Sequence, residues 1–474
     1  MTAQTILPAN SVTASGYDVA NSCRFDGSSS YMQKTLGAPT SAKKATFSLW
    51  FKTSDTIAGN GGRCLMSWGD DAGAIYVNET NDGQWEINLD NSDGLYKGTA
   101  GGQLSRDPAA WSHLCLIIDT TNDTANDRFQ FFLNNVRVVF SANNNNNPDE
   151  DYDVAGLADG QVIAVGRRHS TTSLYYSGYM AEVCFIDGNN LAATNFGEVD
   201  EDSGIFKPID VSGLTFGNNG FYLDFQASGN LGNDANGGTD LTESGLAASD
   251  QSTDTCTNNF ATWNSLIKTT ASLVEGNLKY TTPGSNPVFG SLSTIGVTSG
   301  KWYAELNYTS GSNHKLVLGV ADETFQNGNT TASYDLGKSS TTSSIAYVVN
   351  TGDYRVNNSN TSWGSGGGDG QIINMAIDRD NGKIYFGVNG TWGNSSDPAA
   401  GSDGIPTTAL NSSAWFWGIT SDTSGTGDVG ELNFGSPSYS ESGGETDGNG
   451  YGNFAHAPPS GYYVLNSKNL SEYG

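Results

Sequence analysis

The sequence predicts an all-β protein with two antiparallel β-sandwiches joined by an irregular connector. Apolar and polar residues alternate in many short segments, the chain contains 61 glycines, and charged residues form only 15% of it. This composition is typical of short strands and turns, so we expect little helix. One hydrophobic core usually serves roughly 150 residues, so a chain of 474 residues is expected to form more than one domain.

The first half of the chain contains a regular series of strand-like segments. In FSLWFKT at 47–53, Phe47, Leu49 and Phe51 share one face, which is the period-two pattern of a half-buried strand. The alternation recurs further along, at 63–71, 74–79, 85–90, 113–119, 128–140 and 179–188. Within 128–140, Asn134 and Asn135 are expected to reverse the chain, because Asn tolerates the left-handed backbone of a tight hairpin.

Short motifs in this half follow one another in the order of a known family. CRFDGSSSYM comes first, followed by TFSLWFKT, WSHL at 111–114, FFLNNVRV and YMAEVCFIDG. Together they resemble a concanavalin A-like, laminin-G-type domain, and the resemblance implies a jelly-roll sandwich over residues 1–210. The asparagines at 143–147 and the PDEDYD that follows interrupt the periodicity, so we expect an exposed loop there.

The second half contains a hairpin that defines its fold. Apolar residues alternate at 373–377 and again at 384–388, on either side of an Asp-Asn-Gly turn, and Asn389-Gly390 forms a second turn. Together with GKWYAELNY at 300–308 and KLVLGVAD at 315–322, this hairpin resembles the core of a B30.2/SPRY domain. That resemblance implies a two-sheet sandwich used for binding, which we expect over residues 266–440.

The remaining segments are a connector at 211–265 and a C-terminal tail at 441–474. By composition the connector is a Gly/Asn/Ser/Thr/Asp-rich linker. The string from GFYLDF to NNFATWN nevertheless resembles a connector in virion proteins of tailed phages, and the tail motif HAPPSGYYVLN resembles their closing segment. We expect the tail to be extended and packed on the second sandwich, because Pro458 and Pro459 fit neither a central strand nor a helix interior.

Charge and targeting signals limit the partners. The formal net charge is -28 with only 22 Lys and Arg, which argues against binding to nucleic acid or to anionic membrane surfaces. No run approaches the ~20 apolar residues of a membrane span, and the N-terminus lacks a secretory signal. We therefore expect synthesis in the cytoplasm, and the resemblance to phage proteins implies a place in the virion. The five cysteines lack zinc-ligand spacing and are interpreted as small buried residues.

No catalytic pattern emerges, and the sequence is interpreted as that of a non-enzyme. Glucanases of the concanavalin A-like fold use an E-x-D-x-x-E pattern, but in the nearest string, 198–203, Ser203 replaces the last carboxylate. The four histidines lie near no nucleophile motif. The glycine run at 363–370 lacks the Lys and the helix of a phosphate-binding loop.

Sugar binding needs aromatic rings beside amides or carboxylates, and three loop aromatics have such neighbours. They are Trp363 near Asn360, Trp392 near Asn394, and Tyr152 among acidic residues. Each ring could instead anchor its own loop.

No cofactor is predicted, but the laminin-G resemblance leaves calcium open. The alternative ligands are Asp70 and Asp71, Asp90 and Asp93, or Asp119 and Asp123. Each of these residues could instead be a turn former.

The expected function is that of a phage virion component, a fibre, knob or tail-associated protein that binds a host-surface glycan or receptor through lectin-like loops. Its partners would be other virion proteins, and by analogy with viral fibres we expect a homo-oligomer, with a trimer favoured. Two alternatives stay open. One is a structural head-decoration or fibre protein without receptor binding, and the other is a glycan hydrolase.

Overall fold

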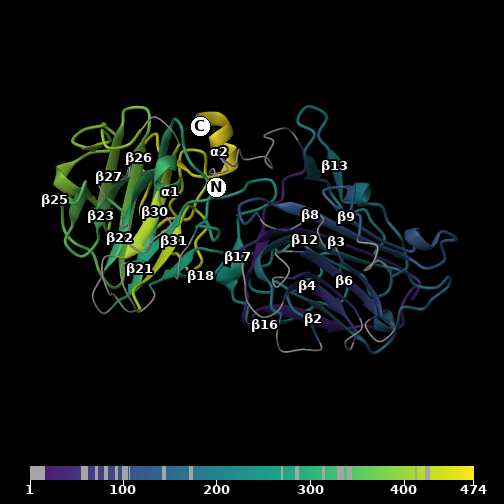
Figure 1. The fold of residues 1–474 in the computed structure, drawn as a ribbon. Coiled ribbons are helices and arrows are strands. Elements are labelled where there is room, and N and C mark those ends of the chain that lie inside the picture. Colours follow the sequence, from purple (N-terminus) through teal and green to yellow (C-terminus); the bar gives the residue numbers. More distant parts are fainter. Residues whose placement is uncertain are drawn as a thin grey trace. The chain divides into compact units, whose positions relative to one another are not determined.

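The computed structural model describes residues 16–54, 62–69, 73–78, 84–90, 94–98, 105, 107–140, 146–169, 174–267, 271–282, 288–311, 315–327, 336–338, 344–411, 414–421 and 427–474. Strands dominate both parts of the chain (Figure 1). The chain divides between Asn258 and Asn259 into two compact units, which we call the N-terminal and the C-terminal unit.

The N-terminal unit contains two large antiparallel sheets. The first runs in the order β10 (Val136–Arg137), β9 (Phe129–Leu133), β8 (Ser112–Asp119), β3 (Lys44–Thr53), β12 (Ser177–Asp187), β1 (Ser22–Asp26) and β17 (Gln251–Ser252), with β15 (Phe221–Leu223) also beside β12. The second runs in the order β16 (Thr242–Ser244), β2 (Tyr31–Thr35), β11 (Val162–Val165), β4 (Gly62–Trp68), β5 (Gly73–Asn78), β6 (Gln84–Asp90) and β7 (Leu95–Gly98).

Smaller elements complete this unit. β13 (Gly197–Val199) and β14 (Phe206–Pro208) form a separate two-stranded hairpin. Single 3-10 turns lie at η2 (Ala125–Asp127), η3 (Ala155–Leu157), η4 (Ala193–Asn195) and η5 (Ala248–Asp250).

The alternation in the sequence decides which side chains of β3 enter the core. Phe47, Leu49 and Phe51 all belong to the main buried cluster of the unit, as predicted. The predicted reversal after β9 is also present, since Asn134 and Asn135 have φ of 46° and 63°. Two consecutive residues with positive φ give the turn a twist that matches the flanking strands.

Residues 211–258 are not the linker that their composition predicts. β15 pairs with β12, β16 pairs with β2, and β17 pairs with β1. Phe221, Leu223 and Leu241 enter the main buried cluster. The segment is therefore part of the first sandwich, and the division of the chain falls at Asn258 rather than at residues 210 and 265.

The C-terminal unit is also built of two sheets, and all its strand pairs are antiparallel except the one between β21 and β32. The larger sheet contains β18 (Ser272–Val274), β19 (Lys279–Thr281), β31 (Val429–Asn433), β21 (Lys301–Ser310), β26 (Gln371–Asp378), β27 (Lys383–Val388) and β28 (Thr391–Trp392), with β29 (Ile405–Pro406) beside β27 and β32 (Tyr463–Val464) beside β21. The smaller sheet contains β20 (Val288–Leu292), β30 (Trp415–Ser421), β22 (Leu316–Asp322), β23 (Ser344–Val348), β24 (Asp353–Val356) and β25 (Ser359–Ser362).

The hairpin of β26 and β27 has the predicted register. Ile373 pairs with Val388, Met375 with Phe386 and Ile377 with Ile384, which places these side chains on one face. With the exception of the half-buried Val388, all of them are fully buried in the cluster between the sheets. The two predicted antiparallel sandwiches and the all-β fold class are thus confirmed.

The C-terminal tail packs on the larger sheet, but it is not extended throughout. β32 pairs in parallel with β21, and the chain then forms the helix α2 (Ser467–Tyr473). Asn466 caps this helix, because its side chain accepts a hydrogen bond from the backbone N–H of Asn469 at 2.9 Å. Elsewhere in the described residues, α1 (Glu323–Asn327) is the other α-helix and η6 (Gly393–Ser395) is a single turn.

All five cysteines are buried and unpaired, as the sequence predicts. In the part of the chain that the structure describes, neither helix is long and apolar enough to cross a membrane.

Candidate functional site

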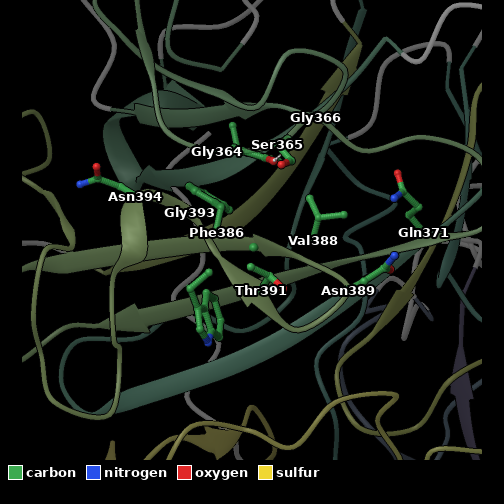
Figure 2. Close-up of a pocket in the computed structure, with 13 residues that line it drawn as sticks. Gly364, Ser365, Gly366, Gln371, Phe386, Val388, Asn389, Thr391, Gly393 and Asn394 are labelled. Atoms are coloured by element: carbon green, nitrogen blue, oxygen red, sulfur yellow. Dashed lines mark hydrogen bonds between the residues drawn. The ribbon is translucent and has the colours of Figure 1, made fainter.

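The most complete candidate site is a cavity of about 340 Å³ beside the β27–β28 turn, which we call the hairpin pocket (Figure 2). It is lined by Tyr347, Gly364, Ser365, Gly366, Gln371, Phe386, Gly387, Val388, Asn389, Thr391, Trp392, Gly393 and Asn394. The volume lies at the lower end of the roughly 300–1,000 Å³ range of small-molecule sites.

The turn between β27 and β28 fixes one wall of the pocket. Asn389 and Gly390 have φ of 48° and 76°, so the chain reverses within two residues. The side-chain oxygen of Asn389 accepts a hydrogen bond from Ile372 N at 2.9 Å, and Asn389 N donates to Ile372 O at 2.8 Å. These bonds tie the turn to the start of β26 and hold the wall in place.

Aromatic rings from both sheets form the base of the site. The rings of Tyr347 and Phe386 are stacked with centroids 5.1 Å apart. The Tyr347 hydroxyl donates to Ser365 O at 2.7 Å, which attaches the opposite wall to the base. Because both rings are buried, they give the pocket an apolar floor but no open face for stacking.

The rim of the pocket is polar and uncharged. Asn394 lies at one end, and Gln371 and Asn389 lie at the other (Figure 2). Gln371 accepts from Gly368 N through its side-chain oxygen at 2.8 Å. Within the part of the chain that the structure describes, the amide nitrogens of Gln371 and Asn389 and the whole amide of Asn394 have no hydrogen-bond partner. They can therefore bond to a ligand.

Trp363 does not offer the exposed ring that the sequence predicts. Only 6% of the residue is exposed, its indole N–H donates to Phe386 O at 2.9 Å, and its ring packs edge-on against Tyr354. A Cβ at Gly393 would overlap the indole, so the backbone of Gly393 lies directly on the ring. Trp363 is thus an anchor behind the pocket wall, which is the second of the two roles that the sequence left open.

Trp392 lines the pocket but is only half-exposed. Its ring meets Tyr303 and Tyr385 edge-on, with centroids 6.3 Å and 6.4 Å away. Both tyrosines belong to a buried cluster on the outer side of the larger sheet, where the tail also packs. Much of the indole therefore holds the short strand β28 in place.

The other predicted sugar-binding residues are divided between the two units. Asn394 lines the pocket with its side chain exposed. Asn360 lies on β25 outside the lining, where its amide contacts Asp353 at 3.4 Å. Tyr152 belongs to the N-terminal unit and packs partly against its core. The structure thus brings Trp392 and Asn394 together, with Trp363 behind them.

Sequence reasoning missed Gln371 and Thr391 as lining residues, and it did not select Asn389. Asn389 was noted as a turn former and as an amide beside Trp392, but it was not among the predicted binding residues. Gln371 and Thr391 were not considered. The Asn-Gly turn was a usable signal, because a tight turn at the end of a buried hairpin presents its side chains at the rim of the sandwich.

Glu198 and Asp200, from the string that most resembles the glucanase pattern, are paired with a lysine near a turn. Glu198 and Asp200 both contact Lys207 at 3.3 Å, and Asp200 also accepts hydrogen bonds from the backbone and the hydroxyl of Ser203. They belong to the β13–β14 hairpin and the turn that follows β13. This arrangement is that of a surface turn.

Glu182 on β12 is a more unusual carboxyl group. It lies at a β-bulge with φ of 51° and is 5% exposed. Its Oε2 accepts hydrogen bonds from Tyr222 at 2.7 Å and Tyr17 at 3.1 Å. Burial raises the pKa of Glu182 to about 7 in spite of these bonds. Both tyrosines also line a cavity of about 360 Å³ in the same unit.

Of the three calcium alternatives, only the pair Asp119 and Asp123 lies wholly within the residues that the structure describes. No group of three or more His, Cys, Asp or Glu side chains in the described residues is arranged to hold a metal ion. Asp119 instead contacts Lys44 at 3.5 Å and accepts from Asn190 at 2.7 Å, and Asp123 is exposed. Asp70, Asp71, Asp93 and the side chain of Asp90 lie outside the described residues.

Several solved structures are similar to parts of this chain. The SPRY domain of human HERC1 is 14% identical with a TM-score of 0.29, and the match covers 36% of this chain and 96% of that domain. A heptameric SAP-like pentraxin from Limulus polyphemus is 12% identical with a TM-score of 0.30 and covers 44% and 96%. The CBM40 of a Ruminococcus gnavus IT-sialidase, bound to alpha2,3 sialyllactose, is 15% identical with a TM-score of 0.23 and covers 35% and 91%.

A comparison with curated protein sequences found no match. Residues 26–189, in the N-terminal unit, match the family model Laminin_G_3, described as the concanavalin A-like lectin/glucanases superfamily.

Proposed function

We propose that this protein binds glycans and that the hairpin pocket is a site for a neutral sugar. The observation that carries the proposal is the ring of uncharged amides around an apolar floor. Sugar hydroxyls need planar donors and acceptors, and the amides of Gln371, Asn389 and Asn394 supply both. The hydroxyl of Thr391 adds another polar group at the same rim.

The lack of charge in the described lining favours a neutral ligand. A buried charge without a partner is costly, so a site for an acidic group would be expected to contain Arg or Lys. The family model that matches residues 26–189 includes lectins, which supports glycan binding. That match lies in the N-terminal unit, so for the hairpin pocket it is an analogy of fold alone.

A glycan array followed by calorimetry tests the proposal. The intact protein is expected to retain one or more neutral glycans, and Asn394→Ala together with Thr391→Ala is expected to weaken them at least about tenfold, the loss of roughly two hydrogen bonds. Asn360→Ala is the matched control, because it removes an exposed amide outside the pocket. Equal weakening by both variants, or no retained glycan, would contradict the proposal.

We further propose that binding occurs without cleavage. Glu182 is the carboxyl group that most resembles a general acid, because its pKa is raised to about 7. Its position beneath two tyrosine hydroxyls supports a structural role instead. Incubation with laminarin, agar-type glycans and host envelope polysaccharide is expected to release no reducing ends. Release that disappears in Glu182→Gln would show a hydrolase.

The proposed setting is the virion of a tailed phage, and its support is the resemblance of the segments 220–264 and 456–466 to phage virion proteins. A structural decoration protein without receptor binding is the competing proposal. Electron microscopy of antibody-labelled particles separates them, since a tail-tip position supports host recognition and a capsid position supports decoration. Absence of the protein from purified particles would contradict both.

A further inference from the structure

A second cavity, of about 310 Å³, lies in the N-terminal unit, and we call it the edge pocket. Its lining includes Lys97 from β7, Phe129 from β9 and Arg137 from β10. β7 is the last strand of one sheet, and β10 is the last strand of the other. The edge pocket therefore lies at one edge of the sandwich, between the last strands of its two sheets.

The most unusual group in this pocket is the ammonium of Lys97. The residue is 3% exposed, and Nζ lies 5.4 Å from the ring centroid of Phe129 and 5.3 Å from that of Phe140. Nζ also donates to the side-chain oxygen of Asn147 at 2.7 Å. Two ring faces and a neutral amide are thus among the contacts of a positive charge at the wall of a cavity, and the carboxylate of Asp127 is near enough to favour its charged form.

A second positive charge lies beside the first. Arg137 lines the same cavity and is paired with Asp127 at 2.7 Å. Burial and the nearby positive charge of Arg137 lower the pKa of Lys97 to about 8. The described lining carries two cations and one carboxylate, in a chain with a formal net charge of -28. An anion in the cavity would offset both the burial and the repulsion.

Apolar surface adjoins these charges. Val139 is 83% exposed, and Phe140 is half-buried beside it; both line the pocket. A sugar ring has an apolar face as well as hydroxyls, so a ring that carries an acidic group can contact the valine and the phenylalanine while its anion meets the cations. A bare inorganic anion would leave this apolar surface unused.

We propose that the edge pocket binds a saccharide carrying an isolated anionic group, a carboxylate or a sulfate. Lys97 and Arg137 contact the anion, and Val139 and Phe140 contact the ring. An isolated anionic group is favoured over a polyanion because the negative charge of the whole chain repels a polyanion at long range. This site is separate from the hairpin pocket and takes a ligand of different charge.

The test uses the intact protein and four small probes: methyl β-D-glucuronoside, methyl β-D-glucoside, glucose 6-sulfate and inorganic sulfate. Titration by NMR is expected to give a dissociation constant for the glucuronoside at least tenfold lower than for the neutral glucoside. Comparison of glucuronoside with glucose 6-sulfate distinguishes the two anionic sources. Equal affinity for inorganic sulfate and the sugars would contradict the role of the apolar contacts.

Variants assign the binding to this pocket. Lys97→Met is expected to weaken glucuronoside binding at least tenfold, and Arg137→Gln several-fold. Lys43→Met is the control for the same change of charge, because Lys43 is paired with Asp151 and lies outside the pocket. Full affinity in Lys97→Met would overturn the proposal, and so would an equal loss in Lys43→Met.

A pH titration of the unsubstituted protein is independent of whether the variants fold. Because burial and the charge of Arg137 lower the pKa of Lys97 to about 8, glucuronoside affinity is expected to fall several-fold between pH 7 and pH 9.5. A flat profile over that range would overturn the proposal. Neutral-glycan binding at the hairpin pocket, measured in the same samples, should stay constant, so the failure of one site is distinguishable from the failure of the other.

Discussion

At the hairpin pocket, two side chains from neighbouring loops occupy opposite environments: Asn394 is exposed at the rim, and Trp363 is buried behind the wall. Asn394 was chosen because amides beside aromatics suit sugars, and it does line a pocket. For Trp363 the sequence left stacking on a sugar and anchoring of the loop as alternatives, because its neighbours are Ser and Gly, which do not indicate burial. Its burial depends on contact with Gly393, thirty positions away, and no local pattern contains that information.

The role of Trp363 as an anchor leads to a stability prediction. Trp363→Ala is expected to destabilise the C-terminal unit by about 3–5 kcal/mol, because it leaves a large cavity and an unpaired Phe386 carbonyl. Denaturant unfolding measures this change. Trp363→Phe should cost less, since it keeps most of the packing. Wild-type stability in Trp363→Ala would indicate an exposed ring instead.

The raised pKa of Glu182 leads to a pH prediction. The folded pKa of about 7 exceeds the ordinary value of 4.5, so the protonated form is favoured in the folded state. The protonated Glu182 stabilises the folded protein fully below pH 4.5. This contribution to the free energy of unfolding, about 3 kcal/mol, is lost as the pH rises through 7.

Glu182→Gln keeps an acceptor for the two tyrosines and cannot ionise. The difference in hydrogen-exchange protection of β12 between wild type and this variant should therefore change between pH 4.5 and 7, in favour of the variant at the higher pH. A difference that does not vary with pH would contradict the raised pKa.

At the scale of strands and turns, local patterns were reliable wherever a segment was long enough to alternate. Segments such as 47–53 and 113–119 became β3 and β8, because period-two burial leaves few alternative registers. The strands β15, β16 and β17 have only two or three residues each, and polar or glycine residues surround them. Their pairing is decided by the neighbouring strands, so composition alone predicted a linker.

The short strands yield a prediction about fragments. A fragment of residues 16–258 should fold cooperatively, whereas residues 16–210 should not, because the shorter one lacks Phe221, Leu223 and Leu241 from its core. Circular dichroism and thermal unfolding of the two fragments measure the difference. Equal cooperativity would mean that 211–258 is a linker after all.

The turn at Asn134-Asn135 offers a second prediction at this scale. Asn135 has φ of 63°, where a side chain branched at Cβ is strained. Asn135→Val should destabilise the N-terminal unit by about 1–2 kcal/mol, while Asn135→Gly should be neutral or stabilising. Denaturant midpoints provide the comparison, and equal stability of the two variants would contradict the left-handed turn.

For the whole molecule, two sandwiches could be predicted from the sequence, because length and strand pattern limit the possible folds. The positions of the cavities could not. The hairpin pocket combines β23, β26, β27 and β28 with the segment 364–366, and the edge pocket combines the last strands of two sheets. Which strands come together around a pocket depends on the order of strands in the sheets, and local sequence patterns do not determine that order.

If glycans bind at the uncharged amides of the hairpin pocket, those amides should respond directly to a ligand in solution. The most direct test is NMR observation of side-chain amide signals while a neutral glycan retained on the array is added. The signals of Gln371, Asn389 and Asn394 are expected to shift with one common dissociation constant, while that of Asn360 stays in place. Shifts at Asn360 without shifts at the other three would contradict the claim.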